Sequence, residues 1–298
     1  MRHKPRYVLE YWCLRAVAIL VGLLPYRCAL ALGWGLAAIG FCLVRFRVKI
    51  AKRRIREIFG PLPDARVRRI AWLSWRNFVF SAMELLRIPA MRPGWLDRVV
   101  EEQGIGKITE HLRSGRGAII ATVHMGSWEM AAMACLNYKI PLFSIAARQK
   151  NSLVDDYMNR LRAQTGFETV LREANVAKGI IRRIRAGKVL AILPDVRSRT
   201  EALSIRFLGG TANIAAGMGV IARQTGVPVF PCVITRKGWA RHLYRVFDPV
   251  FPDDTLDKQS DALCITQSVF DVFDHCIRAE PEQWFWFNKR WLFDPLKP

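Results

Sequence analysis

The sequence predicts an α/β fold: a mixed, mostly parallel sheet flanked by helices, with an apolar helical membrane anchor at the N-terminus. Short apolar runs alternate with helix-like segments from residue 117 to the C-terminus, the pattern of a mostly parallel sheet. Two apolar stretches occupy the first 44 residues, and basic residues flank them. The chain has 298 residues and a net charge of +21, most of it close to those stretches.

Composition excludes several classes of protein. An apolar content of 51% and an aromatic content of 11% exclude a disordered chain. A charged content of 24% argues against a membrane protein with many spans. The seven cysteines contain no Cys-x-x-Cys pair, so neither a disulfide scaffold nor a cysteine metal site is indicated.

The positive charge is concentrated beside the apolar residues. Residues 1–92 contain 18 of the 46 Lys and Arg but only 4 of the 25 Asp and Glu. A nucleic-acid-binding protein concentrates its charge on a polar face, whereas charge beside apolar helices indicates attraction to an anionic membrane leaflet. We therefore expect an anionic membrane as a partner and no nucleic acid. A basic surface also suits an acidic protein partner.

The N-terminal region divides into two apolar helices separated by Pro25. Residues 28–44 carry no charge and would span roughly 26 Å as a helix, slightly less than the hydrocarbon core of a bilayer. Residues 7–24 are apolar apart from Glu10 and Arg15. Basic residues lie before the first helix and after the second, and this favours a cytoplasmic location for both of these ends. A membrane hairpin, two interfacial helices, a single span and two buried helices all remain open.

The remainder of the chain is predicted to form one α/β domain. We assign residues 1–48 to the anchor and 49–298 to this domain. Its first part comprises basic or amphipathic helices at 49–60 and 64–88. The expected strands are 117–123, 141–147, 188–193, 227–235 and 241–248. The expected helices are 127–138, 152–165, 174–186, 212–225 and 260–279, followed by an aromatic tail at 284–293.

A histidine follows the first strand of this domain. His124 lies in the predicted loop after the strand, and Glu129 lies on the first turn of the next helix. Five positions along one helix turn by about 140°, so the two side chains would diverge on a regular helix. With His124 in the loop, Glu129 can fold back and bond the imidazole, whose other nitrogen can then accept a proton. Gly126 allows the tight turn, and Ser127 is a candidate N-cap. A loop histidine with no catalytic role has the same local pattern.

Other catalytic motifs are absent from the sequence. The remaining histidines lack the spacing of zinc ligands with His124. No Gly-x-Ser-x-Gly elbow, phosphate-binding loop or dinucleotide fingerprint is present. We expect neither a metal nor a cofactor.

With its apolar N-terminus and the His124–Glu129 block, the chain resembles the lipid A biosynthesis acyltransferases, the lauroyl and myristoyl transferases of the bacterial inner membrane. These belong to the wider group of His-x4-Asp/Glu glycerolipid acyltransferases. The resemblance extends over nearly the whole chain. It rests on the apolar N-terminus and on blocks at 52–54, 59–61, 123–129, 147–155, 189–195, 207–212 and 281–286.

The resemblance implies roles for particular residues. His124 would be the general base that deprotonates an acceptor hydroxyl, and Glu129 would orient it. The hydroxyl would attack the acyl thioester directly, without an acyl-enzyme. Arg148 would hold a phosphate or polarise the thioester oxygen, and Asp195 would orient Arg148 or cap a loop. Further candidates for anion contact are Arg160, Arg162 and Arg172, for which a solvated helix face is the alternative.

Two departures from the family pattern leave the acceptor open. Val196 and Arg197 follow Asp195 where the family often has a second polar or acidic residue. The tail has Asn288, Lys289 and Arg290 where the family commonly has a His-Arg-Arg-like triplet.

The functional hypothesis is an acyltransferase at the cytoplasmic side of the bacterial inner membrane. It would move a fatty acyl chain from acyl carrier protein, or acyl-CoA, to a hydroxyl of a lipid A precursor. The alternatives are a lysophospholipid or another glycolipid as acceptor, and a non-enzymatic, basic membrane-binding scaffold.

Overall fold

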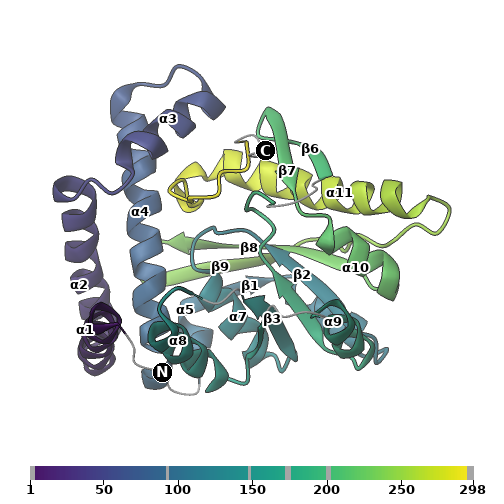
Figure 1. Cartoon of the computed structure of the whole chain (residues 1–298), viewed down its shortest axis with the longest axis horizontal. Helices are drawn as coiled ribbons and strands as arrows, with labels where there is room; N and C mark the ends of the chain where they lie inside the picture. The colour runs from purple at the N-terminus through teal and green to yellow at the C-terminus, as the bar shows by residue number, and fades with distance from the viewer. Residues whose placement is uncertain (1–3, 92–93, 147–148, 172–175, 199–202, 294–298) are drawn as a thin grey trace.

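A seven-stranded sheet forms the centre of the protein (Figure 1). The computed structural model describes residues 4–91, 94–146, 149–171, 176–198 and 203–293. In spatial order the strands are β1 (Val100–Gln103), β9 (Arg241–Val246), β8 (Val229–Lys237), β2 (Ala118–Thr122), β5 (Val189–Ile192), β3 (Leu142–Ala146) and β4 (Glu168–Leu171). Only the β8–β9 pair is antiparallel among these pairings, which confirms the predicted mixed, mostly parallel sheet.

Helices cover both faces of this sheet because its strands are apolar on both faces. In β2, Ile119 and Ala121 belong to one buried cluster and Ala118 and Ile120 to another, as the two-residue period of a strand requires. The first cluster includes residues of α9 (Val176–Arg185), α10 (Gly217–Thr225) and α11 (Lys258–Ala279). The second includes residues of α6 (Ile105–Leu112) and α7 (Trp128–Asn137).

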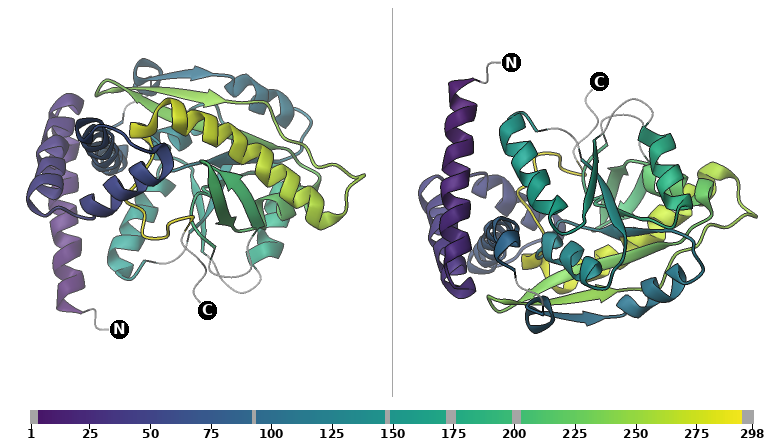
Figure 2. Two further views of the ribbon diagram at one scale, coloured as in Figure 1. Left: turned by 90° about the horizontal axis from the view of Figure 1, so that it is seen from above. Right: turned by 90° about the horizontal axis from the view of Figure 1, so that it is seen from below.

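A long helix connects the N-terminal region to the sheet. This helix, α4 (Asp64–Leu86), lies between the sheet and the two apolar helices (Figures 1 and 2). The helices that complete the description are α1 (Pro5–Leu23), α2 (Tyr26–Ala38) with a π-helical extension (Ile39–Leu43), α3 (Val48–Phe59), α5 (Leu96–Val99), α8 (Ser152–Ala163) and short turns at Ile88–Ala90 and Pro281–Gln283.

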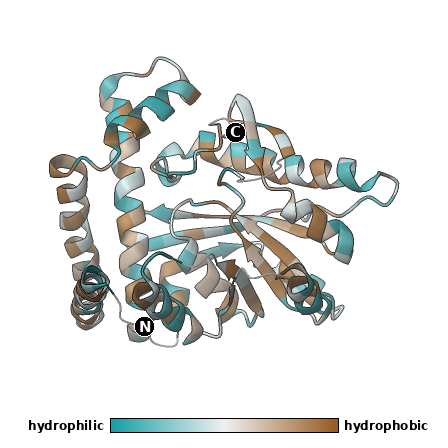
Figure 3. Ribbon diagram, in the orientation of Figure 1, coloured by the Kyte–Doolittle hydropathy of each residue, from teal (hydrophilic) through white to brown (hydrophobic). Residues whose placement is uncertain are grey.

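The apolar helices form one edge of the molecule (Figures 2 and 3). They leave apolar side chains exposed. Their inner sides pack on α4 through a cluster that includes Ala18, Ala29 and Met83. The segment Tyr26–Leu43 has a mean hydropathy of 1.5, and 28% of it is buried. Length and composition alone also fit a core helix, but the low burial favours association with a membrane. Exposed apolar residues of α1 and α2 include Leu9, Trp12, Ile19, Leu20, Leu23, Trp34 and Leu36.

The expected helix at 212–225 is partly wrong. Its first residues belong to β7 (Gly210–Ile214), which pairs with β6 (Leu203–Phe207) in a separate antiparallel hairpin. The helix itself begins at Gly217. Ala212 and Ile214 point into the same buried cluster, so alternation rather than helical periodicity governs this segment. Strands β1 and β4 were also not expected from the sequence.

The contact between α10 and α11 yields a stability prediction. A Cβ at Gly219 would lie 2.3 Å from the carbonyl oxygen of Ala262, an atom of the α11 backbone that cannot move aside alone. We expect Gly219→Ala to lower the free energy of unfolding by about 1–3 kcal/mol through overpacking. Thermal melts in one detergent would measure this. Gly217→Ala is the matched control, since a Cβ at Gly217 meets nothing within 4 Å; equal melting temperatures for the two variants would contradict the prediction.

Candidate active site

A histidine and an aspartate meet where two adjacent parallel strands end. Strands β2 and β5 pair in parallel, with Ala121 opposite Ile192, so their carboxyl ends lie at the same edge of the sheet. His124 follows β2 and Asp195 follows β5. Loops beyond the carboxyl ends of parallel strands are the usual position of active sites in such sheets. The predicted position of His124 is therefore confirmed.

Asp195 holds both the backbone and the ring of His124. Its Oδ1 lies 2.7 Å from His124 Nδ1, and its Oδ2 accepts the backbone N–H of His124 at 2.8 Å. Oδ2 also accepts the indole N–H of Trp284 at 2.9 Å. Because an ionised carboxylate only accepts, the geometry places the imidazole proton on Nδ1. Nε2 is then the nitrogen that can accept a proton, and it has no hydrogen bond to any described residue.

The environment of the pair favours the charged imidazolium. The side chain of Asp195 is 1% exposed and that of His124 is 25% exposed. Burial lowers the pKa of His124, but the charge and hydrogen bond of Asp195, with the charge of Glu129, raise it above 6.5 overall. Burial raises the pKa of Asp195, but His124 and the N–H donors lower it below 3.8 overall. Asp195 would therefore stabilise the imidazolium that forms if Nε2 accepts a proton.

Glu129 does not bond the ring of His124, which corrects the expectation from the sequence. Its carboxylate accepts two hydrogen bonds from Arg162 on α8, at 2.6 Å from Nη2 and 3.2 Å from Nε. The bidentate geometry of this pair directs Glu129 toward α8, and Asp195 takes the place at the imidazole. Glu129 still acts on His124 through its charge.

Arg160, another predicted binding residue, is separate from this pair. Arg160, two residues before Arg162, is exposed and faces a cavity of about 500 Å³ between α1 and α8, with Arg15 on its other wall. None of the residues that line this cavity belongs to the His124–Asp195 pair. Arg148 and Arg172 lie outside the residues that the structure describes.

The loop that carries His124 is held in an unusual backbone conformation. Gly126 has a φ of +58°, as the predicted tight turn requires. A Cβ there would lie 2.1 Å from the carbonyl oxygen of Ile234, so the loop also packs directly on β8. Ser127 precedes α7, as predicted for an N-cap, but its side chain makes no capping hydrogen bond.

The C-terminal segment completes the site. Phe285 donates its N–H to the carbonyl oxygen of His124 at 2.8 Å, and Gly126 donates its N–H to the carbonyl oxygen of Gln283. Trp284, between them, reaches Asp195. The block at 281–286 contributed to the family resemblance, but nothing in its local pattern connects an indole to an aspartate 89 residues earlier. The sequence therefore did not reveal Trp284 as a site residue.

The buried His–Asp pair fits the wider similarity of the chain. A family model described as "Bacterial lipid A biosynthesis acyltransferase" matches residues 1–293. The chain belongs to this family. It is also similar to the phosphatidylinositol mannoside acyltransferase of Mycolicibacterium smegmatis, at 25% identity over 82% of this chain and 79% of that protein. The corresponding protein of Mycobacterium tuberculosis (strain CDC 1551 / Oshkosh) is 24% identical over 82% of this chain and 77% of its own length.

The two pKa shifts of the acyltransferase predict how its stability depends on pH. The raised pKa of His124 adds stability that is complete below pH 6.5 and is lost as the pH rises through the folded value. The lowered pKa of Asp195 adds stability that is present above pH 3.8. Asp195→Asn should therefore cost about 3 kcal/mol near pH 6, where the charged pair is intact, and less at pH 9.

Melting temperatures in detergent between pH 5 and 9 would measure this difference. In a His124→Gln background the same Asp195→Asn change should lose its pH dependence, because the titrating partner is gone. A difference in melting temperature between the wild type and Asp195→Asn that stays constant with pH would contradict the assignment of the His124–Asp195 pair.

Proposed function

We propose that this acyltransferase moves a fatty acyl chain from the thioester of acyl carrier protein, or of acyl-CoA, to a hydroxyl of a lipid A precursor. The observation that carries the proposal is the buried Asp195 on Nδ1 of His124, which leaves Nε2 open to an acceptor. This is the arrangement of a general base with an orienting carboxylate. The family match over residues 1–293 supports the acceptor class.

The proposed reaction is a single displacement. Nε2 of His124 accepts the proton of the acceptor hydroxyl as the oxygen attacks the thioester carbonyl. Asp195 stabilises the imidazolium that forms. The carbon–oxygen bond forms, the carbon–sulfur bond breaks, and the departing thiolate takes the proton from Nε2. The products are an ester and a free thiol, and no covalent intermediate with the enzyme is needed.

The two carboxylates of the site have different proposed roles. Asp195 takes the orienting role that the resemblance assigned to Glu129. Glu129 contributes its charge, which favours the imidazolium, and holds Arg162 beside the catalytic helix α7. Arg148 and Arg172 remain candidates for contact with an acceptor phosphate or the thioester oxygen, as the resemblance implies. Arg160 is a candidate for contact with an anionic group that enters from the α1 side.

Charge and hydropathy support the proposed partners and location. A net charge of +21 attracts both an acidic carrier protein and a phosphorylated glycolipid. Residues 1–48 are the proposed membrane anchor and 49–298 the proposed catalytic domain. The proposed location of the reaction is the cytoplasmic face of the inner membrane, which the basic residues beside the apolar helices support. The exposed apolar face of α1 and α2 supports the anchor.

A second candidate acceptor is phosphatidylinositol mannoside. The specific observation in its favour is the name of the relatives, which are phosphatidylinositol mannoside acyltransferases at 23–25% identity. Both candidates are anionic glycolipids with free hydroxyls, so the same base would serve either one.

Product analysis with the purified protein in detergent separates these acceptors. The protein is incubated with mixed acyl carrier protein thioesters or acyl-CoA, and with a tetra-acylated lipid A precursor or phosphatidylinositol mannoside in parallel. Mass spectrometry then looks for the gain of one acyl chain. A gain on the lipid A precursor supports the proposal, and a gain on phosphatidylinositol mannoside alone supports the second candidate. No gain on any lipid acceptor, with retained binding to liposomes, would instead support a membrane-binding scaffold.

Removal of the proposed base should abolish most of the activity. We expect His124→Ala to lower kcat by about 10²–10⁴-fold, the range attributed to general base catalysis. His275→Ala is the matched control, because His275 is exposed on α11 and should leave the rate unchanged. Initial rates with a saturating thioester would measure both. Wild-type turnover in the His124→Ala variant would contradict the mechanism.

A further inference from the structure

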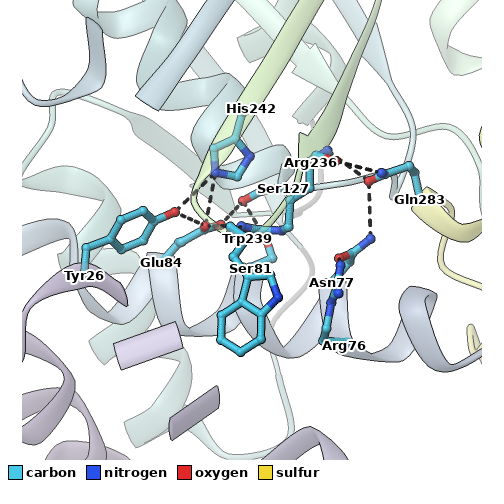
Figure 4. Close-up of polar contacts among 10 residues, drawn as sticks. All are labelled: Tyr26, Arg76, Asn77, Ser81, Glu84, Ser127, Arg236, Trp239, His242 and Gln283. Carbon is cyan, nitrogen blue, oxygen red and sulfur yellow. Dashed lines mark hydrogen bonds and ion pairs between the residues drawn. The ribbon is translucent and has the colours of Figure 1, made fainter. Parts of the chain in front are cut away.

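A second buried polar cluster lies beside the His124 loop and plays no part in the proposed proton transfer (Figure 4). We call it the Glu84 cluster. It brings together side chains from α2, α4, the His124 loop, β8 and β9, which are far apart in the sequence. Its members are Tyr26, Glu84, Ser127, Arg236 and His242.

The centre of the cluster is a bidentate ion pair that is fully shielded from solvent. Arg236 donates from Nη1 to Glu84 Oε1 at 2.7 Å and from Nη2 to Glu84 Oε2 at 2.8 Å, and both side chains are 0% exposed. Burial raises the pKa of Glu84, but the charge of Arg236 lowers it below its usual range overall. Burying such a pair gains little stability over apolar packing, because desolvation offsets the attraction. Stability alone therefore does not explain the pair, and the residues that it holds in place indicate its role.

One oxygen of Glu84 holds the His124 loop. Ser127 donates its hydroxyl to Glu84 Oε2 at 2.6 Å. This bond explains why Ser127 makes no capping hydrogen bond to α7: its hydroxyl is directed away from the helix and into the cluster. Ser127 is only three residues from His124, and its side chain is buried.

The backbone of Arg236 holds the same loop from a second direction. Its N–H and carbonyl oxygen bond the side-chain amide of Gln283, at 2.9 and 3.0 Å. The backbone carbonyl oxygen of Gln283 in turn accepts the N–H of Gly126. Two consecutive loop residues are thus fixed to Arg236: Gly126 through Gln283 and Ser127 through Glu84. Figure 4 shows the side chains of Arg236, Gln283, Glu84 and Ser127.

The other oxygen of Glu84 connects the cluster to the apolar N-terminal region. Tyr26 donates its hydroxyl to Glu84 Oε1 at 2.6 Å, and His242 Nε2 lies 3.1 Å from the same oxygen. Burial lowers the pKa of His242, and this outweighs the opposite effect of Glu84. Because an ionised carboxylate only accepts, Nε2 of His242 is the donor in this contact. Tyr26 is the first residue of α2 and of the apolar segment Tyr26–Leu43.

We propose that Glu84 is a positioning residue for the proposed acyl transfer: it holds Ser127 so that His124 stays on Asp195, and through Tyr26 it links the seating of α2 to the geometry of the catalytic loop. This inference rests on the proposed function. The alternative is an ion pair that only stabilises the packing of α4 on β8.

Conservative variants test the proposal, because Glu84→Gln would leave Arg236 buried beside a neutral partner and so destabilise the fold. Ser127→Ala removes only the hydroxyl that reaches Glu84, and Tyr26→Phe removes only the one on α2. Thr235→Val is the matched control: Thr235 is 0% exposed, next to Arg236 on β8, and its hydroxyl has no partner among the described residues.

Kinetics distinguish positioning from simple stabilisation. We expect Ser127→Ala to lower kcat by about 10- to 100-fold with KM nearly unchanged, since small displacements of a catalytic group are costly. The acid limb of its pH profile should move to lower pH, because a looser contact with Asp195 lowers the pKa of His124. Tyr26→Phe should lower kcat in the same direction, and Thr235→Val should match the wild type. Equal kcat and an unchanged pH profile in Ser127→Ala would overturn the proposal.

A double-variant cycle tests the connection to α2. If Tyr26 and Ser127 both act through Glu84, the loss in Tyr26→Phe with Ser127→Ala should be smaller than the product of the two single losses. Losses that multiply, or a Tyr26→Phe variant with wild-type kcat, would overturn the link to α2.

A substrate-free measurement separates this inference from the proposed function. NMR titration of labelled histidines, with His124 assigned by comparison with His124→Gln, reports its pKa without any acyl donor. We expect a lower pKa in Ser127→Ala than in the wild type and no change in Thr235→Val. A wild type without acyl transfer activity would refute the proposed function, whereas an unchanged His124 pKa in Ser127→Ala would refute the positioning role alone.

Discussion

The parallel pairing of β2 with β5 is the constraint on which the site depends. Because the two strands run in the same direction and are adjacent, the chain leaves both at one edge of the sheet. His124 and Asp195 therefore meet although 71 residues separate them. Asp195 accepts hydrogen bonds from the ring and from the backbone of His124, so it fixes both the histidine side chain and the loop that carries it. A mixed sheet with a different strand order would separate these residues, whatever their local sequence.

The final segment of the chain contributes as much to the site as the strands do. Residues 283–285 pair with the His124 loop through backbone hydrogen bonds, and Trp284 occupies one oxygen of Asp195. The basic helix α3 supports this segment from the other side: Arg54 donates to the carbonyl oxygens of Trp286 and Asn288 and stacks on Trp291. Part of the N-terminal positive charge is thus buried as structure, and only the remainder is available to a membrane or an acidic partner.

Two neighbouring ion pairs hold the His124 loop, and they differ in their exposure to solvent. The His124–Asp195 pair is partly exposed through the His124 side chain, whereas both side chains of the Glu84–Arg236 pair are fully buried. In a low-dielectric interior each buried charge needs a partner, and the hydrogen bonds left over after pairing are directed at specific neighbours. At Glu84 those neighbours are Ser127, Tyr26 and His242. The apolar edge of the molecule and the His124 loop therefore share one buried carboxylate.

The sequence by itself determined the fold class, the main helices and strands, the place of His124 at a strand end and the tight turn at Gly126. These follow from local periodicity and local backbone sterics, which act within a few residues. The sequence did not determine which side chains bond to which partners. Sequence proximity favoured Glu129 for His124 and a helix cap for Ser127, but Arg162 draws Glu129 away and Glu84 takes the Ser127 hydroxyl. Only the tertiary structure decided these pairings, because ion pairs and hydrogen bonds form between groups that are near in space, whatever their separation along the chain.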